Sequence, residues 1–583
     1  MSDTKKRIAI IGGGPSGLFM FKQLIESGQP VEISIFEKSG KLGAGMPYSN
    51  AGANEEHVTN VSDNEIPSIV SHVNDWISNS KADLLRRFNI DPQSFNEYKV
   101  MPRLFFGEYL SGQFNLLLEQ AKQKEIPVQL FLQHAVKDVT DDPDKKEICI
   151  QTEKEEPLSF DVCVIATGHH WPLKYEKKVK GYFDSPYPPS KLRLQANHTV
   201  AIRGTSLTAI DAIRTLARSN GCFEKNENEE LTYTKAAGSD HFKIRLHSRN
   251  GLLPAIRFHM EEPRIFTHVP LTPDEIATNR AENDGFLSLD FVFENAFKKP
   301  LQEKEPGFYK RVKDLRMEAF VDFIMEYREK MDPFVLFRSE YAEAEKSIHQ
   351  RKSIYWKELL AILSFAMNYP AKHFSAEDML RLNRSLSQLI TIVIAFIPQN
   401  PAAELLALHA AGVIDIIAVG ETSRIEPHEE EGIIYHYTDE KNHTHADHYR
   451  LFIDCIGQPP LSVNELPFKT LVKEKTVSQA YLKFKNQEAG KAELEKGEEE
   501  VKKEGEKSYY LKVPGIAIND NFQVVDAYGA YNDRIYMMAV PYMSGYNPDY
   551  SGLDFCEKAS GLIVKSMFKE VSPPNKQGAE QKL

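Results

Sequence analysis

Closely spaced cysteines are missing from this chain of 583 residues. The sequence has five cysteines, all far apart, and no two of them form a Cys-x-x-Cys pair. A disulfide framework, a structural zinc site and a dithiol relay all need closer spacing, so we expect none of them. The N-terminal residues also lead directly into a short apolar strand, without a signal-peptide segment. These absences predict a cytoplasmic protein without a metal site.

Excess positive charge and long apolar runs are missing as well. Lysine and arginine number 71 against 83 aspartates and glutamates, which gives a net charge of −12. This balance argues against nucleic-acid binding, since no excess of cations is left to meet phosphates. The longest apolar run, Leu389 to Ile397, is too short to cross a bilayer. We therefore expect neither a nucleic-acid nor a membrane partner, and composition leaves the oligomeric state open.

A glycine-rich turn, Gly12-Gly13-Gly14-Pro15-Ser16-Gly17, lies between an apolar strand and a helix near the N-terminus, and the next strand ends at Glu37. Gly12 permits the tight turn, Gly14 lets backbone amides approach a pyrophosphate, and Gly17 lets the helix pack against the strand. The N-terminus of the helix then faces the phosphates with the positive end of its dipole. Glu37, 20 positions beyond Gly17, is placed to accept hydrogen bonds from an adenosine ribose. The unit predicts a dinucleotide site of the kind that both NAD and FAD use.

Three further segments decide between these two nucleotides. They are Lys38 to Tyr48, Arg103 to Leu110, and a strand that ends in Ala166-Thr167-Gly168. With the turn, they resemble the flavin domain of two-dinucleotide-domain flavoproteins, and in particular flavin-dependent N-hydroxylating monooxygenases. An alternative for Arg103 is a surface cation at the start of a helix. The resemblance implies that FAD is bound by Gly12, Gly14, Pro15, Ser16, Gly17, Glu37, Lys38, Gly45, Met46, Asn60, Arg103, Val136, Thr167, Gly168, Gly545 and Asn547.

The C-terminal segment departs from the pattern of these flavoproteins. A last strand from Arg534 leads into a loop and a helix, which in the family cover the flavin ring. The loop usually carries Gly-Asp, and this chain has Val540-Pro541 instead. The flavin contacts of Gly545 and Asn547 are therefore assigned by position alone.

A second strand–turn–helix unit begins near residue 198, and its second strand ends at Ser248-Arg249. It resembles the nicotinamide-nucleotide domain that is inserted in the flavin domain of the same flavoproteins. Ser206 stands in place of the second glycine, and a hydroxyl and a guanidinium at the strand end suit a 2′-phosphate. The unit predicts NADPH in preference to NADH; the alternative is a retained fold whose nicotinamide site has degenerated. The predicted contacts are Gly204, Thr205, Ser206, Leu207, Thr208, Ser248 and Arg249.

The predicted fold class is α/β, with two Rossmann-like dinucleotide-binding domains, one for FAD and one for NAD(P), and a largely helical insertion. The FAD-binding domain is predicted to have a first part at 1–190 and a last part at 466–570, with a charged excursion at 486–507. The NAD(P)-binding domain is predicted to have a first part at 191–271 and a return at 413–465. The helical insertion, as the candidate substrate or cap region, is predicted at 272–412, and a disordered tail at 571–583.

Substrate contacts are expected in or near the helical insertion, because the other domains are already assigned to cofactors. For each candidate the alternative is a structural role. The candidates are Arg257, His259, Arg264, Tyr355, Trp356, Asn368 and His373. A group of four histidines has no metal-ligand spacing and is expected to be a solvated polar loop, namely His436, His443, His445 and His448.

These features predict an FAD-dependent oxidoreductase that uses NAD(P)H. The resemblance favours a flavin monooxygenase that hydroxylates a small molecule, with an amine nitrogen as the suggested position. The flavin carries the chemistry in such enzymes, so catalytic side chains are not predicted. One alternative is an NAD(P)H-dependent flavin reductase or dehydrogenase without oxygen insertion. A second alternative is a non-catalytic nucleotide-binding sensor. Ser206 and the altered C-terminal loop support this alternative.

Overall fold

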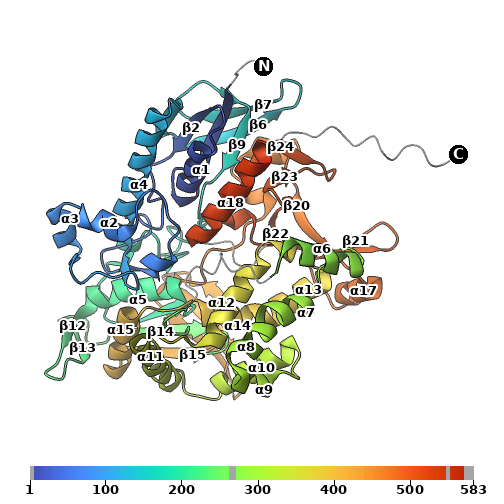
Figure 1. The fold of residues 1–583 in the computed structure, drawn as a ribbon. Helices are drawn as coiled ribbons and strands as arrows, with labels where there is room; N and C mark the ends of the chain where they lie inside the picture. The colour runs from blue at the N-terminus through green and yellow to red at the C-terminus, as the bar shows by residue number, and fades with distance from the viewer. Residues whose placement is uncertain (1–4, 262–270, 440, 547–551, 570–583) are drawn as a thin grey trace.

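The computed structural model describes residues 5–261, 271–439, 441–546 and 552–569 (Figure 1). Two of the predicted contacts, Arg264 and Asn547, and the tail at 571–583 lie outside the described residues. Among the described residues, no helix is both long enough and apolar enough to span a bilayer.

The first nucleotide domain is built on a six-stranded sheet with the order β23-β24-β9-β1-β2-β5. Strand β1 pairs in parallel with β2 and with β9, and β24 brings a C-terminal strand in parallel against β9. Helices α1 and α4 and the C-terminal α18 belong to this domain (Figure 1). The central strands are apolar and buried, as expected for a parallel sheet covered on both faces. The bounds are β1 Lys6–Ile11, α1 Pro15–Glu26, β2 Val31–Glu37, α4 Arg103–Gln123, β5 Val128–Leu132, β9 Val162–Ile165, β23 Gln523–Val525, β24 Tyr531–Met537 and α18 Gly552–Met567.

The second nucleotide domain has a parallel five-stranded sheet with the order β10-β19-β11-β14-β15. Its strands come from distant parts of the chain, because the helical insertion lies between β14 and β15. The edge strand β10, Tyr182–Phe183, precedes the predicted boundary at residue 191, so the chain crosses into this domain earlier than predicted. The other bounds are β11 Thr199–Arg203, α5 Leu207–Asn220, β14 Lys243–Ser248, β15 Ile414–Ala418 and β19 Leu451–Asp454.

The insertion is helical, and together with the two sheets this confirms the predicted fold class. It extends across the lower part of the molecule in Figure 1. Its helices are α6 Pro273–Glu282, α7 Leu289–Phe293, α8 Lys299–Lys304, α9 Pro306–Val312, α10 Met317–Glu329, α11 Pro333–Gln350, α12 Tyr355–Met367, α13 Ala376–Arg381, α14 Ser387–Ile394 and α15 Gln399–Ala410.

The insertion shares its hydrophobic core with the first nucleotide domain. One continuous cluster holds Ile10 and Phe36 of the first sheet together with Leu359 of α12 and Leu389 of α14. A separate cluster fills the second nucleotide domain, and from the insertion it takes in residues of α11 and α15 and the connecting residues Phe396 and Ile397. The insertion therefore starts and ends in the second nucleotide domain but packs mainly against the first.

Small antiparallel sheets complete the molecule. The charged excursion is ordered as helix α17, Gln487–Glu495, followed by strand β21, Val501–Glu504, which pairs with β22. The remaining small elements are β3 Val58–Ser62, α2 Val73–Ser78, α3 Ala82–Arg87, β4 Val100–Pro102, β6 Val136–Asp142, β7 Glu147–Thr152, β8 Leu158–Phe160, β12 Gly221–Lys225, β13 Leu231–Lys235, β16 Arg424–Pro427, β17 Ile433–Thr438, β18 Thr444–Tyr449, α16 Lys469–Lys473, β20 Gln479–Lys483 and β22 Ser508–Ile516.

The prediction of a histidine loop is wrong for three of its four members. His436 lies on β17, and His445 and His448 lie on β18, its antiparallel partner. Only His443 lies in the turn between the two strands. The pattern was misleading because this sheet alternates buried tyrosines with polar residues on its outer face, which looks like a polar loop in sequence.

Candidate functional site

The glycine-rich turn of the first domain has the close backbone contacts that its spacing predicts. Gly12 has a φ of +115°, and a Cβ there would collide with the carbonyl oxygen of Ala166 on the neighbouring strand. A Cβ at Gly17 would collide with the carbonyl oxygen of Gly12. The turn, the helix start and the Ala166-Thr167-Gly168 strand end therefore meet without intervening side chains.

The N-terminus of α1 is left uncapped by side chains. Its N-cap residue is Gly14, which has no side chain to offer, and Pro15 occupies the first turn. The free amides and the positive end of the helix dipole are therefore directed at the space beside the turn. An anionic pyrophosphate fits such a cradle.

Glu37 closes the turn from the side. Its two carboxylate oxygens accept hydrogen bonds from the amides of Gly13, at 2.8 Å, and of Ser39, at 2.7 Å. A carboxylate oxygen can accept two hydrogen bonds, so each oxygen keeps capacity for a ribose hydroxyl. The Glu37 contact therefore orders the turn and still fits the predicted ribose.

The remaining predicted FAD residues lie in different surroundings. Lys38 and Asn60 are exposed, whereas Gly45, Met46, Val136, Thr167 and Gly168 are half-buried. Ser16 is joined to the C-terminal helix, since its Oγ lies 3.4 Å from Cys556 Sγ on α18. Gly545 is buried, and a Cβ there would collide with Pro514. The role of Gly545 in this structure is thus close packing against β22.

Arg103 is not a surface cation. Its side chain is 16% exposed, and one guanidinium nitrogen lies 2.5 Å from Asp211 Oδ2 on α5 of the second domain. The flavin contact predicted for Arg103 stays a prediction. No local pattern pointed to Asp211 as its partner, because the two residues are 108 positions apart.

The predicted NADPH residues gather at one cavity of about 600 Å³, which we call the nucleotide cavity. Gly204, Thr205, Ser206, Ser248 and Arg249 all line it. Leu207 and Thr208 follow in the first turn of α5. Thr205 also forms a hydrogen bond within the domain, since its hydroxyl donates to the carbonyl of Leu252 at 2.8 Å.

Two groups at the end of β14 are left without partners. Within the part of the chain that the structure describes, the buried Oγ of Ser248 has no hydrogen-bond partner, and the exposed Arg249 guanidinium forms no ion pair. An unpaired buried hydroxyl is costly unless a ligand satisfies it. A hydroxyl and a guanidinium side by side fit the doubly charged 2′-phosphate of NADP.

Sequence reasoning missed His247, the residue just before Ser248. His247 lines the nucleotide cavity, is 1% exposed and stacks on Tyr435 of β17 with ring centroids 4.2 Å apart. Burial lowers the pKa of this imidazole to about 4, so it is neutral at pH 7. Its place at the strand end was visible in the sequence, but Tyr435 comes from a sheet that the sequence did not predict.

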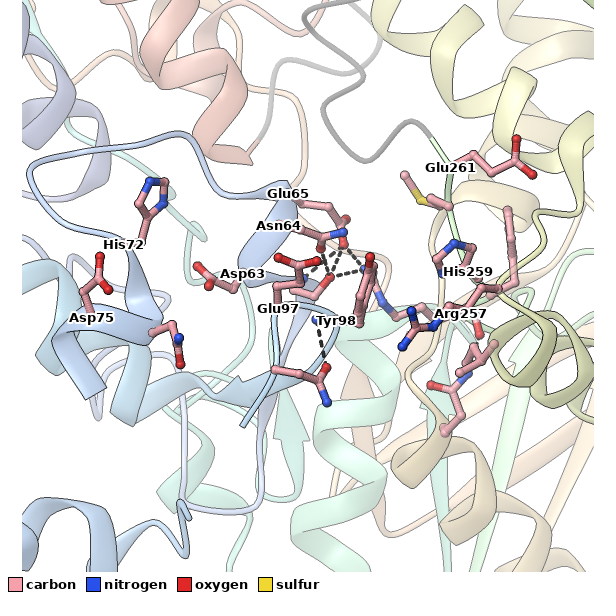
Figure 2. Close-up of a pocket in the computed structure, with 18 residues that line it drawn as sticks. Asp63, Asn64, Glu65, His72, Asp75, Glu97, Tyr98, Arg257, His259 and Glu261 are labelled. Carbon is pink, nitrogen blue, oxygen red and sulfur yellow. Dashed lines mark hydrogen bonds and ion pairs between the residues drawn. The ribbon is translucent and has the colours of Figure 1, made fainter. Parts of the chain in front are cut away.

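A larger cavity, about 1240 Å³, lies where the first domain, the second domain and α11 meet, and we call it the junction cavity. Figure 2 shows Asp63, His72 and Asp75 on one side of it, and His259 and Glu261 on the other. Its carboxylates are Asp63, Glu65, Asp75, Glu97 and Glu261, and its arginines are Arg257 and Arg351. Burial raises the pKa of Asp63 above its ordinary value.

The predicted substrate contacts are not brought together. Arg257 and His259 line the junction cavity. Tyr355 is buried in the core that the insertion shares with the first domain, and Trp356 packs against it. Asn368 is also buried, and His373 lies 3.2 Å from Asp520. Burial and pairing explain these residues as parts of the fold.

Comparisons with known protein families match two parts of the chain. Residues 9–170 match a family described as FAD-NAD(P)-binding, and residues 272–394 match the YdhS-like middle domain. A relative, the uncharacterized protein YdhS of Escherichia coli (strain K12), is 27% identical over 575 residues, which cover 97% of this chain and 98% of that protein.

Solved structures with a similar course of the chain include two ornithine hydroxylases. The enzyme of Pseudomonas aeruginosa is 12% identical with a TM-score of 0.46, and the ornithine N-hydroxylase of Kutzneria sp. 744 is 11% identical with a TM-score of 0.44; both matches cover 97% of this chain and 99% of the other. A bacillithiol disulfide reductase of Staphylococcus aureus is 10% identical with a TM-score of 0.40, over 97% of this chain and 98% of the reductase. The two family models thus match separate parts of this chain: residues 9–170 lie in the first nucleotide domain, and residues 272–394 lie in the helical insertion.

Proposed function

We propose that this protein is an FAD-dependent oxidoreductase that takes its electrons from NADPH. The observation that carries the proposal is the pair of nucleotide sites in one chain. The uncapped N-terminus of α1 beside Gly12 and Glu37 fits the diphosphate and ribose of FAD. The nucleotide cavity, with Ser248 and Arg249 at its edge, fits NADPH. The cysteines, all five of them free thiols, support a cytoplasmic location.

The preference for NADPH over NADH rests on the end of β14. An acidic residue at this position would accept hydrogen bonds from the 2′-hydroxyl of NADH and repel a 2′-phosphate. This chain has instead a hydroxyl without a described partner and an arginine without a described ion pair. Both groups can donate hydrogen bonds to a phosphate.

The proposed reaction is hydroxylation of a small molecule, with an amine nitrogen as the position attacked. FAD supplies the redox and oxygen chemistry when bound, and the chain binds, orients and excludes water. The junction cavity is the proposed place of the substrate. Arg257 is paired with Glu65 there, which leaves four carboxylates against Arg351, so the cavity favours a cationic ligand.

The test is anaerobic reduction of the FAD-loaded protein, followed by oxygen. NADPH should bleach the flavin absorbance faster than NADH at equal concentration. Incubation with a panel of primary amines, NADPH and oxygen should then yield a product heavier by one oxygen atom, measured by mass spectrometry. If NADPH reduces the flavin and oxygen then yields only hydrogen peroxide, the result would favour the reductase. A flavin that neither nucleotide bleaches would contradict the proposal and favour the nucleotide sensor.

A further inference from the structure

Two buried arginines join the nucleotide domains, and they reach across the domain boundary in opposite directions. Arg103 extends from α4 of the first domain to Asp211 on α5 of the second. Arg257 lies beyond β14 of the second domain and extends to the segment of β3 in the first. We call these contacts the Arg103 clamp and the Arg257 clamp.

The Arg103 clamp holds α5 by a shared carboxylate. Asp211 Oδ2 accepts from Arg103 at 2.5 Å and from the hydroxyl of Tyr187 at 2.8 Å. The side chain of Asp211 is only 5% exposed. Burial disfavours its charge, but the positive charge of Arg103 and the hydrogen bonds from Tyr187 and Arg103 act together against burial, and the pKa of Asp211 lies below its ordinary value. The ion pair is therefore present throughout the neutral pH range.

His57 adds a second contact to the same turn of α5. Its Nδ1 accepts from the amide of Asn54 at 3.2 Å, so the proton of the neutral ring sits on Nε2. Nε2 lies 3.1 Å from the backbone carbonyl of Asp211, to which it donates. Burial lowers the pKa of His57, which keeps the ring neutral. Asp211 is thus held by its side chain and by its backbone.

The Arg257 clamp holds strand β3 of the first domain. One guanidinium nitrogen donates to the carbonyl of Asn60 at 2.5 Å, and the other donates to Ser62 Oγ at 2.9 Å and pairs with Glu65. The side chains of Arg257 and Glu65 are 9% and 11% exposed. Both residues line the junction cavity, and Figure 2 labels them.

Both arginines also donate hydrogen bonds to backbone carbonyls of β3. Arg103 Nε donates to the carbonyl of Val58 at 2.9 Å, and Arg257 donates to the carbonyl of Asn60, two residues further along the same strand. Carbonyls two residues apart point to the same side of a strand. Strand β3 is therefore held by one arginine from each domain, and Arg103 links it directly to the helix that follows the Gly204 turn.

We propose that Arg103 and Arg257 are positioning residues that set the spacing between the two nucleotide sites. This inference rests on the proposed function, in which a hydride passes from NADPH to FAD. Reacting atoms must approach to about 3–3.5 Å for such a transfer, and a misplacement of about 1 Å can cost two orders of magnitude in rate. Asp211 is five residues beyond Ser206, about 7–8 Å along the helix. The clamp therefore acts within two turns of the nucleotide cavity.

The experiment compares Arg103→Met and Arg257→Met with a matched control, Arg328→Met. Arg328 of α10 forms a similarly buried pair with Glu340 of α11, 2.7 Å apart, so that both partners belong to the insertion. In FAD-loaded protein, the dissociation constant of NADP⁺ and the limiting rate of flavin reduction by NADPH are measured separately. We expect the reduction rate to fall tenfold or more in both clamp variants, and the dissociation constant to change less than threefold. Arg328→Met should leave both values unchanged.

Hydrogen exchange at residues 207–215 gives a readout that needs no turnover. Exchange there should rise in Arg103→Met and stay at the wild-type level in Arg328→Met. Equal losses of affinity and rate, or the same effects in Arg328→Met, would overturn the inference. Arg103→Lys keeps the charge but not both contacts; it should show a smaller effect of the same sign, and it replaces Arg103→Met if that variant does not fold. A wild-type flavin that NADPH does not reduce would overturn the proposed function, while the exchange measurement would still decide whether the clamp orders α5.

Discussion

At the scale of single residues, the glycine turn of the first domain has no tolerance for a side chain. We expect Gly12→Ala to lower the FAD content of the purified protein severely, because φ is +115° there and the added methyl group collides with Ala166. The flavin-to-protein absorbance ratio measures the effect. Gly307→Ala is the control, since no atom lies within 4 Å of a Cβ at that helical position. Full flavin content in Gly12→Ala would contradict the proposed FAD site beside this turn.

The end of β14 carries a second prediction at the same scale. Ser248→Ala and Arg249→Ala should each weaken NADP⁺ binding about tenfold to a hundredfold, since a hydrogen bond to a charged group contributes about 1.5–3 kcal/mol. Affinity for NAD⁺, which lacks the 2′-phosphate, should stay within about threefold of wild type. Titration calorimetry with both nucleotides checks this. Equal losses for both nucleotides would place the two residues away from the phosphate.

At the scale of elements, the small sheet β16-β17-β18 covers the end of β14 and buries His247. Burial lowers the folded-state pKa of His247 from 6.5 to about 4, so the unfolded chain binds more protons between these two values. The stabilisation from the neutral ring is complete above pH 6.5 and is lost as the pH falls toward 4. It amounts to about 3 kcal/mol, at about 1.4 kcal/mol per pK unit.

We therefore expect His247→Phe to reduce the drop in thermal midpoint between pH 7 and pH 4.5. Scanning calorimetry at the two pH values measures that drop. The same substitution at the exposed His241 is the control and should leave the wild-type drop in place. An unchanged drop in His247→Phe would show that other titratable groups cause the acid sensitivity.

At the scale of the whole molecule, the two larger hydrophobic clusters do not follow the order of the chain. The insertion shares one of them with the first nucleotide domain, while α11, α15 and the connection that precedes α15 join the cluster of the second domain. Elements that share a core open together in native-state hydrogen exchange. In low denaturant, amides of α12 should therefore exchange with the same opening free energy as those of β1, and amides of α15 with that of β11. Exchange of α12 together with β11 would contradict this division.

The two strand–turn–helix units and the helical character of residues 272–412 could be predicted from the sequence, because glycine spacing, apolar strands and helical periodicity are local patterns. The close backbone approaches at Gly12 and Gly17 were predictable for the same reason, whereas the ribose contact of Glu37 stays a prediction. Tertiary structure alone decided what Arg103 and Arg257 touch, since their partners lie 108 and about 195 positions away. It also decided which domain the insertion packs against. No local pattern specifies a contact between separate elements; it depends on which buried surfaces and charges meet once the two sheets have formed.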